Sequence, residues 1–287
     1  MKIAVGTANF NEKYGIYKNK VKSDNLKKIF KIIKYNNIKY LDTAFDYNSS
    51  SKIRNYSNVN NLKILSKIKL PKKRINFFLE GLEKKITKEL DFLKIKSFEA
   101  LLFHDVKDLK SKYFKIFLKK ILFLKKKKLI KMIGVSVYDP NDLKTVFLKF
   151  NPDIVQFSLN IFDDRPIKSK WFEILKKKKI TIQIRSIFLQ GILLKENKLI
   201  QKKKLNKKLR LKILEFNNWC KRHKISKLDA CINFVSKIKG IKIITIGVNN
   251  SLELNQVLKA FKKNKPIKLK SFSTSDLSII DPRKWKN

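Results

Sequence analysis

One complete repeat of the pattern that decides the fold lies in residues 99–137, EALLFHDVKDLKSKYFKIFLKKILFLKKKKLIKMIGVSV. It opens with an apolar run at 99–104, continues with an amphipathic segment at 113–124, and closes with a second apolar run at 132–137. Continuous apolar runs separated by longer amphipathic segments are typical of parallel strands joined by helices. The stretch therefore predicts a strand, a helix and a second strand parallel to the first.

The same alternation extends in both directions over most of the chain. The predicted strands are IAVGTA (3–8), KYLDTA (39–44), KILSKI (63–68), EALLFH (99–104), MIGVSV (132–137), IVQFSLN (154–160), TIQIRSI (181–187) and KIITIGV (242–248). Predicted helices include 25–37, 75–90, 141–150, 170–179 and 252–264. Eight such units in about 250 residues predict an α/β fold, a (β/α)₈ TIM barrel. An open doubly wound sheet would usually carry a Gly-x-Gly-x-x-Gly turn, which this sequence lacks.

No linker rich in proline, glycine or serine divides the chain, so we predict a single barrel domain over residues 1–287. The lysine-rich segment 195–225 is expected to add a loop and a helix after the seventh strand. The tail, 271–287, either folds back over the barrel or stays loose.

The charge of the chain is extreme, with 69 basic and 23 acidic residues and a net charge of +46. Only seven of the basic residues are arginines, and the lysines are spread over almost every predicted helix. Nucleic-acid readers usually depend on arginine forks and on one basic stripe, so we predict no specific nucleic-acid partner. The positive field favours anionic ligands, such as a sugar phosphate or another sugar derivative.

Other whole-chain features favour a cytoplasmic protein. Cys220 and Cys231 form no Cys-x-x-Cys motif and have no histidine at ligand spacing, so neither a metal site nor a disulfide framework is expected. The apolar stretch at the amino terminus is too short for a signal peptide. Lysines interrupt the most apolar helix, 113–124, so no membrane association is predicted. No pattern indicates the oligomeric state.

Polar side chains gather where three consecutive predicted strands end. Asp42 and Tyr47 follow the second strand, Lys67 closes the third, and His104 ends the fourth. Active sites of this fold lie at the carboxyl ends of the strands, so these four side chains are expected to converge on one mouth. Each has a structural explanation alone, but together they favour a catalytic site.

The motifs that carry these residues resemble those of the aldo-keto reductase family. The similarity includes VGTANF at the amino terminus, LDTAFDY, SK, LLFHD, IGVSVYDP, IVQFSLN and the late IGVNNSLELNQVL, so it spans almost the whole chain. The resemblance implies a catalytic tetrad of Asp42, Tyr47, Lys67 and His104. It also implies an NADPH cofactor, with NADH as the alternative, held by Gly6, Thr7, Ser136, Gln156, Ser186, Leu189, Gly247, Val248, Asn249 and Asn250.

The chemistry of these residue types fits the reduction of an aldehyde or ketone to an alcohol. Hydride transfer to a carbonyl leaves charge on its oxygen, so a proton donor is needed there, and Tyr47 can serve. A lysine ammonium close by favours loss of the tyrosine proton. Asp42 is expected to pair with Lys67, and the His104 imidazole to orient the carbonyl.

The sequence departs from the family pattern at three positions. Val137 stands where many relatives have an asparagine, and Asn48 stands where a glycine is common. Asn249 replaces a basic residue that binds the 2′-phosphate of NADPH, so little discrimination between NADPH and NADH is expected. Lysines that could compensate follow on the next helix, at 259, 262 and 263.

Three alternatives stay open at the level of sequence. Lys67 could form a Schiff base in an aldolase-type lyase. The chain could be a nucleotide-binding regulatory or sensor subunit with slow turnover, or its charge could reflect adsorption to nucleic acid. Substrate specificity is expected in four variable loops, at 48–60, 106–111, 162–169 and 190–204.

Overall fold

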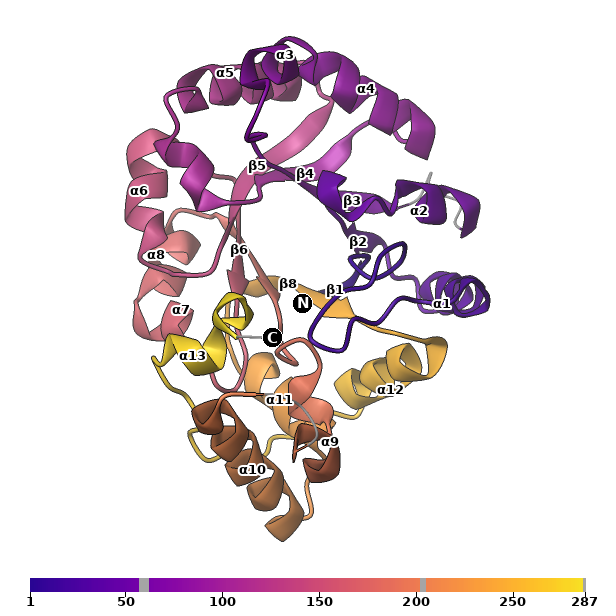
Figure 1. The fold of residues 1–287 in the computed structure, drawn as a ribbon, viewed down its shortest axis with the longest axis vertical. Coiled ribbons are helices and arrows are strands. Elements are labelled where there is room, and N and C mark those ends of the chain that lie inside the picture. Colours follow the sequence, from indigo (N-terminus) through magenta and orange to yellow (C-terminus); the bar gives the residue numbers. More distant parts are fainter. Residues whose placement is uncertain (57–61, 202–204, 286–287) are drawn as a thin grey trace.

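Eight parallel strands close into a barrel in which each strand pairs with the next and β8 returns to β1 (Figure 1). The computed structural model describes residues 1–56, 62–201 and 205–285. The strands are β1 (Lys2–Gly6), β2 (Tyr40–Asp42), β3 (Lys63–Ile68), β4 (Phe98–Phe103), β5 (Ile130–Val137), β6 (Ile154–Ser158), β7 (Thr181–Arg185) and β8 (Ile241–Gly247). The predicted (β/α)₈ barrel is confirmed, with strand ends shifted by a few residues.

The helices surround the barrel (Figure 1). They are α1 (Ser23–Tyr35), α2 (Ser50–Tyr56), α3 (Ile75–Glu80), α4 (Leu82–Leu93), α5 (Phe114–Lys126), α6 (Asp142–Lys149), α7 (Arg165–Lys168), α8 (Trp171–Lys177), α9 (Asn197–Gln201), α10 (Lys207–Arg222), α11 (Lys227–Ser236), α12 (Ser251–Lys262) and α13 (Leu277–Ile280). The predicted single helix 75–90 is wrong. Gly81 ends α3 and precedes α4, and glycine is a poor residue for a helix interior.

The inside of the barrel has an apolar lower layer and a polar upper one. The apolar layer packs residues from six strands: Ala4, Tyr40, Leu65, Ala100, Leu102, Ile154 and Ile243. At Gly134 the strands β5 and β6 approach so closely that an added Cβ would lie 2.0 Å from the carbonyl oxygen of Ile154. Above this layer, toward the carboxyl ends of the strands, lie the buried polar side chains of the candidate site.

The segments that are additional to the eight strand–helix units lie over one side of the barrel. After β7 the chain forms α9 and α10, which confirms the extra helix predicted there. The tail returns to the barrel: the Thr274 amide donates to the Phe162 carbonyl, and Arg283 stacks on Tyr138. Of the two alternatives for the tail, the structure shows the folded one, with α13 packed against α10. None of the helices described is long and apolar enough to cross a bilayer.

Candidate active site

An ion pair between Asp42 and Lys67 lies inside the barrel. Lys67 Nζ is 2.5 Å from Asp42 Oδ1 and also donates to the Thr43 carbonyl at 3.0 Å. The two residues are only 4% and 2% exposed. Because a buried charge without a partner costs several kcal/mol, each residue depends on the other. The predicted pair is present, at the ends of β2 and β3.

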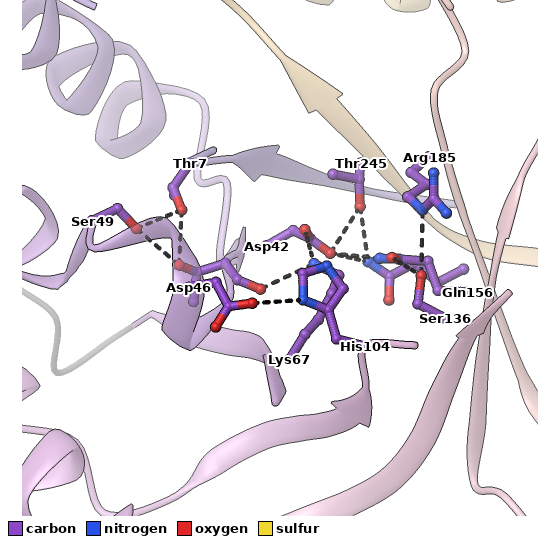
Figure 2. Close-up of polar contacts among 12 residues, drawn as sticks. Thr7, Asp42, Asp46, Ser49, Lys67, His104, Ser136, Gln156, Arg185 and Thr245 are labelled. Carbon is purple, nitrogen blue, oxygen red and sulfur yellow. Dashed lines mark hydrogen bonds and ion pairs between the residues drawn. The ribbon is translucent and has the colours of Figure 1, made fainter. Parts of the chain in front are cut away.

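The second carboxylate oxygen of Asp42 has three partners that the sequence analysis did not assign to it. Gln156 and Gln183 donate their amide hydrogens to Oδ2 at 2.6 and 2.7 Å, and Thr245 lies at 3.4 Å (Figure 2). Gln183 also donates to Thr245 at 2.8 Å. A polar residue inside an apolar strand, as in TIQIR, is the signal that could have revealed Gln183.

Tyr47 and His104 lie beside the ion pair. Their rings meet edge to face with centroids 5.8 Å apart, and Lys67 Nζ is 5.4 Å from the Tyr47 ring centroid. His104 Nδ1 lies 3.7 Å from an oxygen of Asp46. The structure therefore brings all four predicted side chains to one mouth of the barrel.

The loop that carries Tyr47 explains one departure from the family pattern. Asn48 adopts a left-handed conformation, with φ of 48°. Glycine takes this conformation at no steric cost, and asparagine is the other residue that visits it routinely. Asn48 also donates to Glu12 at 2.6 Å, so the asparagine ties this loop to the one after β1.

Burial shifts the pKa values of both aromatic residues. It raises the pKa of Tyr47, and the negative charge of Asp42 raises it further, while Arg185 opposes these effects. The net direction is opposite to the lowering expected from a lysine close by, because burial and the Asp42 charge outweigh the nearby positive charge. Burial, helped by the Lys67 charge, lowers the pKa of His104 to about 4. At neutral pH Tyr47 thus holds its proton and His104 is uncharged.

A pocket of about 990 Å³ opens from Asp42 and Tyr47 toward β7, β8, α11 and α12. Its size is at the upper end of the range for small-molecule and cofactor sites. Gly191 and Gly247 line it, and no atom lies within 4 Å of a Cβ built at either, so their backbone faces open space. The loop after β1 contributes Tyr14, Gly15 and Tyr17, which the predicted specificity loops did not include.

The residues predicted to hold a cofactor fall into two groups. Those that line the pocket are Gly6, Thr7, Ser186, Gly247, Val248 and Asn249. The others do not line it: Leu189 is fully buried, Asn250 caps α12, and Ser136 is buried and donates to Gln156 Oε1 at 3.0 Å. That oxygen has a second lone pair, so Gln156 keeps the capacity to accept another hydrogen bond.

The loop after β7 carries backbone strain. Ser186, Leu189 and Gln190 have φ values of 64°, 47° and 56°, a region that residues other than glycine rarely adopt. Such strain gathers at ligand-binding segments and is maintained by the surrounding structure. Ser186 and Gln190 line the pocket, which connects this loop to binding.

Of the predicted specificity loops 48–60 and 190–204, residues 57–60 and 202–204 lie outside the part of the chain that the structure describes.

Asn249 is already engaged within the protein. Its backbone amide donates to Glu253 Oε2 at 2.7 Å, and its Nδ2 lies 3.1 Å from the same oxygen. Glu253 also lines the pocket, together with Lys259 and Lys263. Lys262 does not line it and instead donates to Asn36 at 3.2 Å. Two of the three compensating lysines thus face the cavity.

The sequence matches the model of the aldo/keto reductase family over residues 2–276, nearly its full length. The chain belongs to the aldo/keto reductase family. Its fold is that of an oxidoreductase family whose members generally use nicotinamide cofactors. A search of curated protein sequences gave no significant match.

Solved aldo-keto reductases share the fold at low sequence identity. An aldo-keto reductase from Bacillus halodurans in its holo form is 14% identical, covers 93% of this chain and 88% of its own, and superposes with a TM-score of 0.65. A glycerol dehydrogenase from Gluconobacter oxydans is 16% identical, covers 93% of each chain, and has a TM-score of 0.64. A thermostable aldo-keto reductase in complex with the inhibitor epalrestat is 18% identical. The match covers 96% of this chain and 92% of that protein, with a TM-score of 0.64.

His104 makes the stability of the protein depend on pH. The unfolded chain binds a proton at this histidine near pH 6.5 and the folded chain only near pH 4, so unfolding becomes easier as the pH falls through that window. Between pH 7.5 and 4.5 this residue should remove about 2–3 kcal/mol from the free energy of unfolding. Urea titrations at both pH values should show that the free energy of unfolding falls less in His104→Gln than in the wild type. An equal loss in the variant would contradict the lowered pKa.

Proposed function

We propose that this aldo/keto reductase uses NAD(P)H to reduce an aldehyde or ketone to an alcohol, with Tyr47 as proton donor. The observation that carries the proposal is the buried Asp42–Lys67 pair beside Tyr47 and His104, at the inner end of a large pocket. As a single functional unit, residues 1–287 would supply both the catalytic groups and the cofactor site.

The four polar residues have separable tasks in this proposal. When bound, the nicotinamide supplies a hydride, which leaves negative charge on the carbonyl oxygen. Tyr47 retains its proton at neutral pH and can donate it there. Lys67 stands close enough to stabilise the tyrosinate that results, and Asp42 keeps this lysine in place. The uncharged imidazole of His104 can donate a hydrogen bond that orients the carbonyl.

The pocket has groups that fit a nicotinamide dinucleotide. Beside the lining, Gln156 Oε1 accepts from the Ser136 hydroxyl and keeps a second lone pair that could accept from a carboxamide. Backbone at Gly6, Ser186 and Gly247 lines the cavity, where phosphate groups can approach closely. Val248, Asn249 and Asn250 lead into α12, although the Asn250 side chain already caps the Glu253 amide.

The Schiff-base alternative requires an unpaired lysine. Lys67 donates to both Asp42 and Thr43, which favours its role as a fixed charge. No comparable observation supports the regulatory alternative. We therefore favour turnover over nucleotide sensing.

Titration with both reduced nucleotides, followed by addition of carbonyl compounds, tests the proposal. We expect enhanced nucleotide fluorescence on binding and then oxidation of the cofactor in step with loss of the carbonyl. Tight nucleotide binding without turnover on a broad panel of aldehydes and ketones would support the regulatory subunit. Absence of nucleotide binding would contradict the cofactor assignment.

Glu253 gives a prediction about cofactor preference. The Glu253 carboxylate holds Asn249 where a 2′-phosphate is expected. Its negative charge should therefore weaken the binding of NADPH relative to that of NADH. We expect weak discrimination in the wild type and a shift toward NADPH of about threefold to tenfold in Glu253→Gln, shrinking as salt rises. Dissociation constants measured at low and high salt check this.

The matched control for this measurement is Glu173→Gln, which removes an exposed carboxylate from α8 outside the pocket. The placement of the 2′-phosphate near Asn249 and Glu253 would be wrong if Glu253→Gln and Glu173→Gln shifted the preference for NADPH equally. A wild-type preference for NADPH above about a thousandfold that survived high salt would also contradict it, since that would require a specific basic contact.

A further inference from the structure

Arg185, at the end of β7, is a cation in the pocket with no acidic partner in the described part of the chain. Its Nε lies 3.4 Å from Ser136 Oγ (Figure 2). Its Nη1 lies 3.2 Å from Ser186 Oγ, so both contacts are to neutral hydroxyls. Arginine has five N–H donors, so these contacts leave Nη2 free for a ligand. The residue is half-buried and lines the same cavity as Tyr47.

The two other arginines nearby, in contrast, each have a carboxylate partner. Arg165 binds Asp163 at 2.7 and 2.9 Å, and Arg283 binds Asp281 at 2.6 Å. Both aspartates are buried. The protein thus neutralises two guanidinium groups at this side of the mouth and leaves the third, which faces the pocket, without a counter-charge.

Tyr138 connects the three arginines and fixes Arg185 in place. The guanidinium carbons of Arg185 and Arg283 lie 4.0 and 3.7 Å from the centroid of its ring. Arg165 donates to its carbonyl at 2.9 Å. A stacked guanidinium is held in one plane, which prepares it to bind a planar or tetrahedral oxyanion with two parallel hydrogen bonds.

The composition of the chain makes an arginine here informative. Lysine supplies almost all of the positive charge, yet three of the seven arginines surround Tyr138. Lysine would provide a point charge, whereas only arginine provides a planar fork and a stacking face. A half-buried cation without a counter-charge is unfavourable until an anion arrives, so the site should prefer a charged ligand to a neutral one.

We infer that Arg185 binds a carboxylate or phosphate carried by the carbonyl substrate, so that the enzyme selects anionic aldehydes or ketones. This inference rests on the proposed reductase function and adds a substrate class to it. The anionic group would dock on the guanidinium while the carbonyl reaches Tyr47 and His104, since Arg185 and Tyr47 line one cavity. A neutral substrate would leave the guanidinium unpaired.

Matched substrate pairs test the selection. We would measure kcat and KM for 4-carboxybenzaldehyde against 4-methylbenzaldehyde, and for glyceraldehyde 3-phosphate against glyceraldehyde. At least one anionic member should be preferred about tenfold or more, as expected for a charged hydrogen bond worth about 1.5–3 kcal/mol. Arg185→Met should lower kcat/KM for that member about 10-fold to 100-fold, mainly through KM, and change the neutral member little. The pair that responds identifies carboxylate or phosphate.

Two further variants separate a specific contact from the general field. Arg185→Lys keeps the charge without the fork and should recover only part of the preference. Arg222→Met removes an exposed charge from α10 outside the pocket and should leave the preference unchanged. If Arg222→Met reduced the preference as much as Arg185→Met, the selection would come from net charge and the inference would be wrong.

Cofactor binding and anion binding distinguish the remaining outcomes. Equal losses for charged and neutral substrates, with weaker NADPH binding in Arg185→Met, would assign Arg185 to the cofactor and overturn the inference alone. If the wild type reduced no carbonyl compound, the proposed function would fail. Calorimetry with benzoate and inorganic phosphate would then test the anion site directly: binding lost in Arg185→Met supports it, and no binding to the wild type overturns it.

Discussion

Tyr47→Phe is expected to lower turnover by about two to four orders of magnitude, because it removes the hydroxyl that donates the proton. The dissociation constant of NADPH should barely change, since the hydroxyl acts on the carbonyl. The phenyl ring keeps the edge-to-face contact with His104, so the fold of the mouth should persist. Steady-state kinetics and nucleotide titration of the same preparation measure both quantities.

Tyr35→Phe is the matched control for this prediction. Tyr35 is 90% exposed on α1 and does not line the pocket, so loss of its hydroxyl should leave turnover unchanged. Near-normal turnover in Tyr47→Phe would remove this tyrosine from the mechanism. A comparable fall in cofactor affinity would instead assign its hydroxyl to nucleotide binding.

The arrangement of strands could be predicted because apolar runs of the right length recur with helical segments between them. The predicted bounds of the strand 63–68 match those of β3, whereas the predicted strand 154–160 extends two residues beyond β6. β6 ends at Ser158, and the chain then turns so that Asn160 pairs with Asp163. Leu159 and Ile161 stay buried under this turn. Burial therefore continues past the end of a strand, and an apolar pattern does not mark that end.

The ion pair could be predicted from the order of strands, but its surroundings could not. Asp42 and Lys67 end neighbouring strands, so a barrel brings them together. Gln183 and Arg185 lie two residues apart on β7, so they share one face of a strand that is distant from Asp42 in sequence. Only the closed barrel shows that Gln183 contacts Asp42. The direction of the Tyr47 pKa shift likewise depends on burial, which the sequence does not provide.

Substitutions at Lys67 separate its two candidate roles. Lys67→Met removes the charge and should abolish activity whether the lysine is a fixed charge or a nucleophile. Lys67→Arg retains a positive charge beside Asp42, so a fraction of reductase activity should survive despite the larger planar head. A Schiff-base enzyme would lose all activity, since a guanidinium group cannot form the imine. Measurable turnover in Lys67→Arg supports the fixed charge.

Asp42→Asn tests the other half of the pair. The variant leaves Lys67 buried without a counter-charge, a change that costs about 3–5 kcal/mol when one partner of a buried pair is removed. Its amide also brings a donor next to the amides of Gln156 and Gln183, which both donate to Asp42 Oδ2. We expect lower turnover together with a lower free energy of unfolding. Wild-type values for both would show that the pair contributes neither to catalysis nor to stability.

Borohydride treatment in the presence of a carbonyl substrate decides between hydride transfer and imine chemistry. Borohydride reduces an imine to a stable amine, so a lysine nucleophile would retain a substrate adduct that mass spectrometry can map. Lys67 is held in an ion pair with Asp42 and also donates to the Thr43 carbonyl, and an ammonium group does not attack a carbonyl. We therefore expect no adduct at Lys67 and oxidation of NAD(P)H in step with loss of the carbonyl. An adduct at Lys67 that forms without the nucleotide would overturn the reductase assignment, because imine formation requires no hydride.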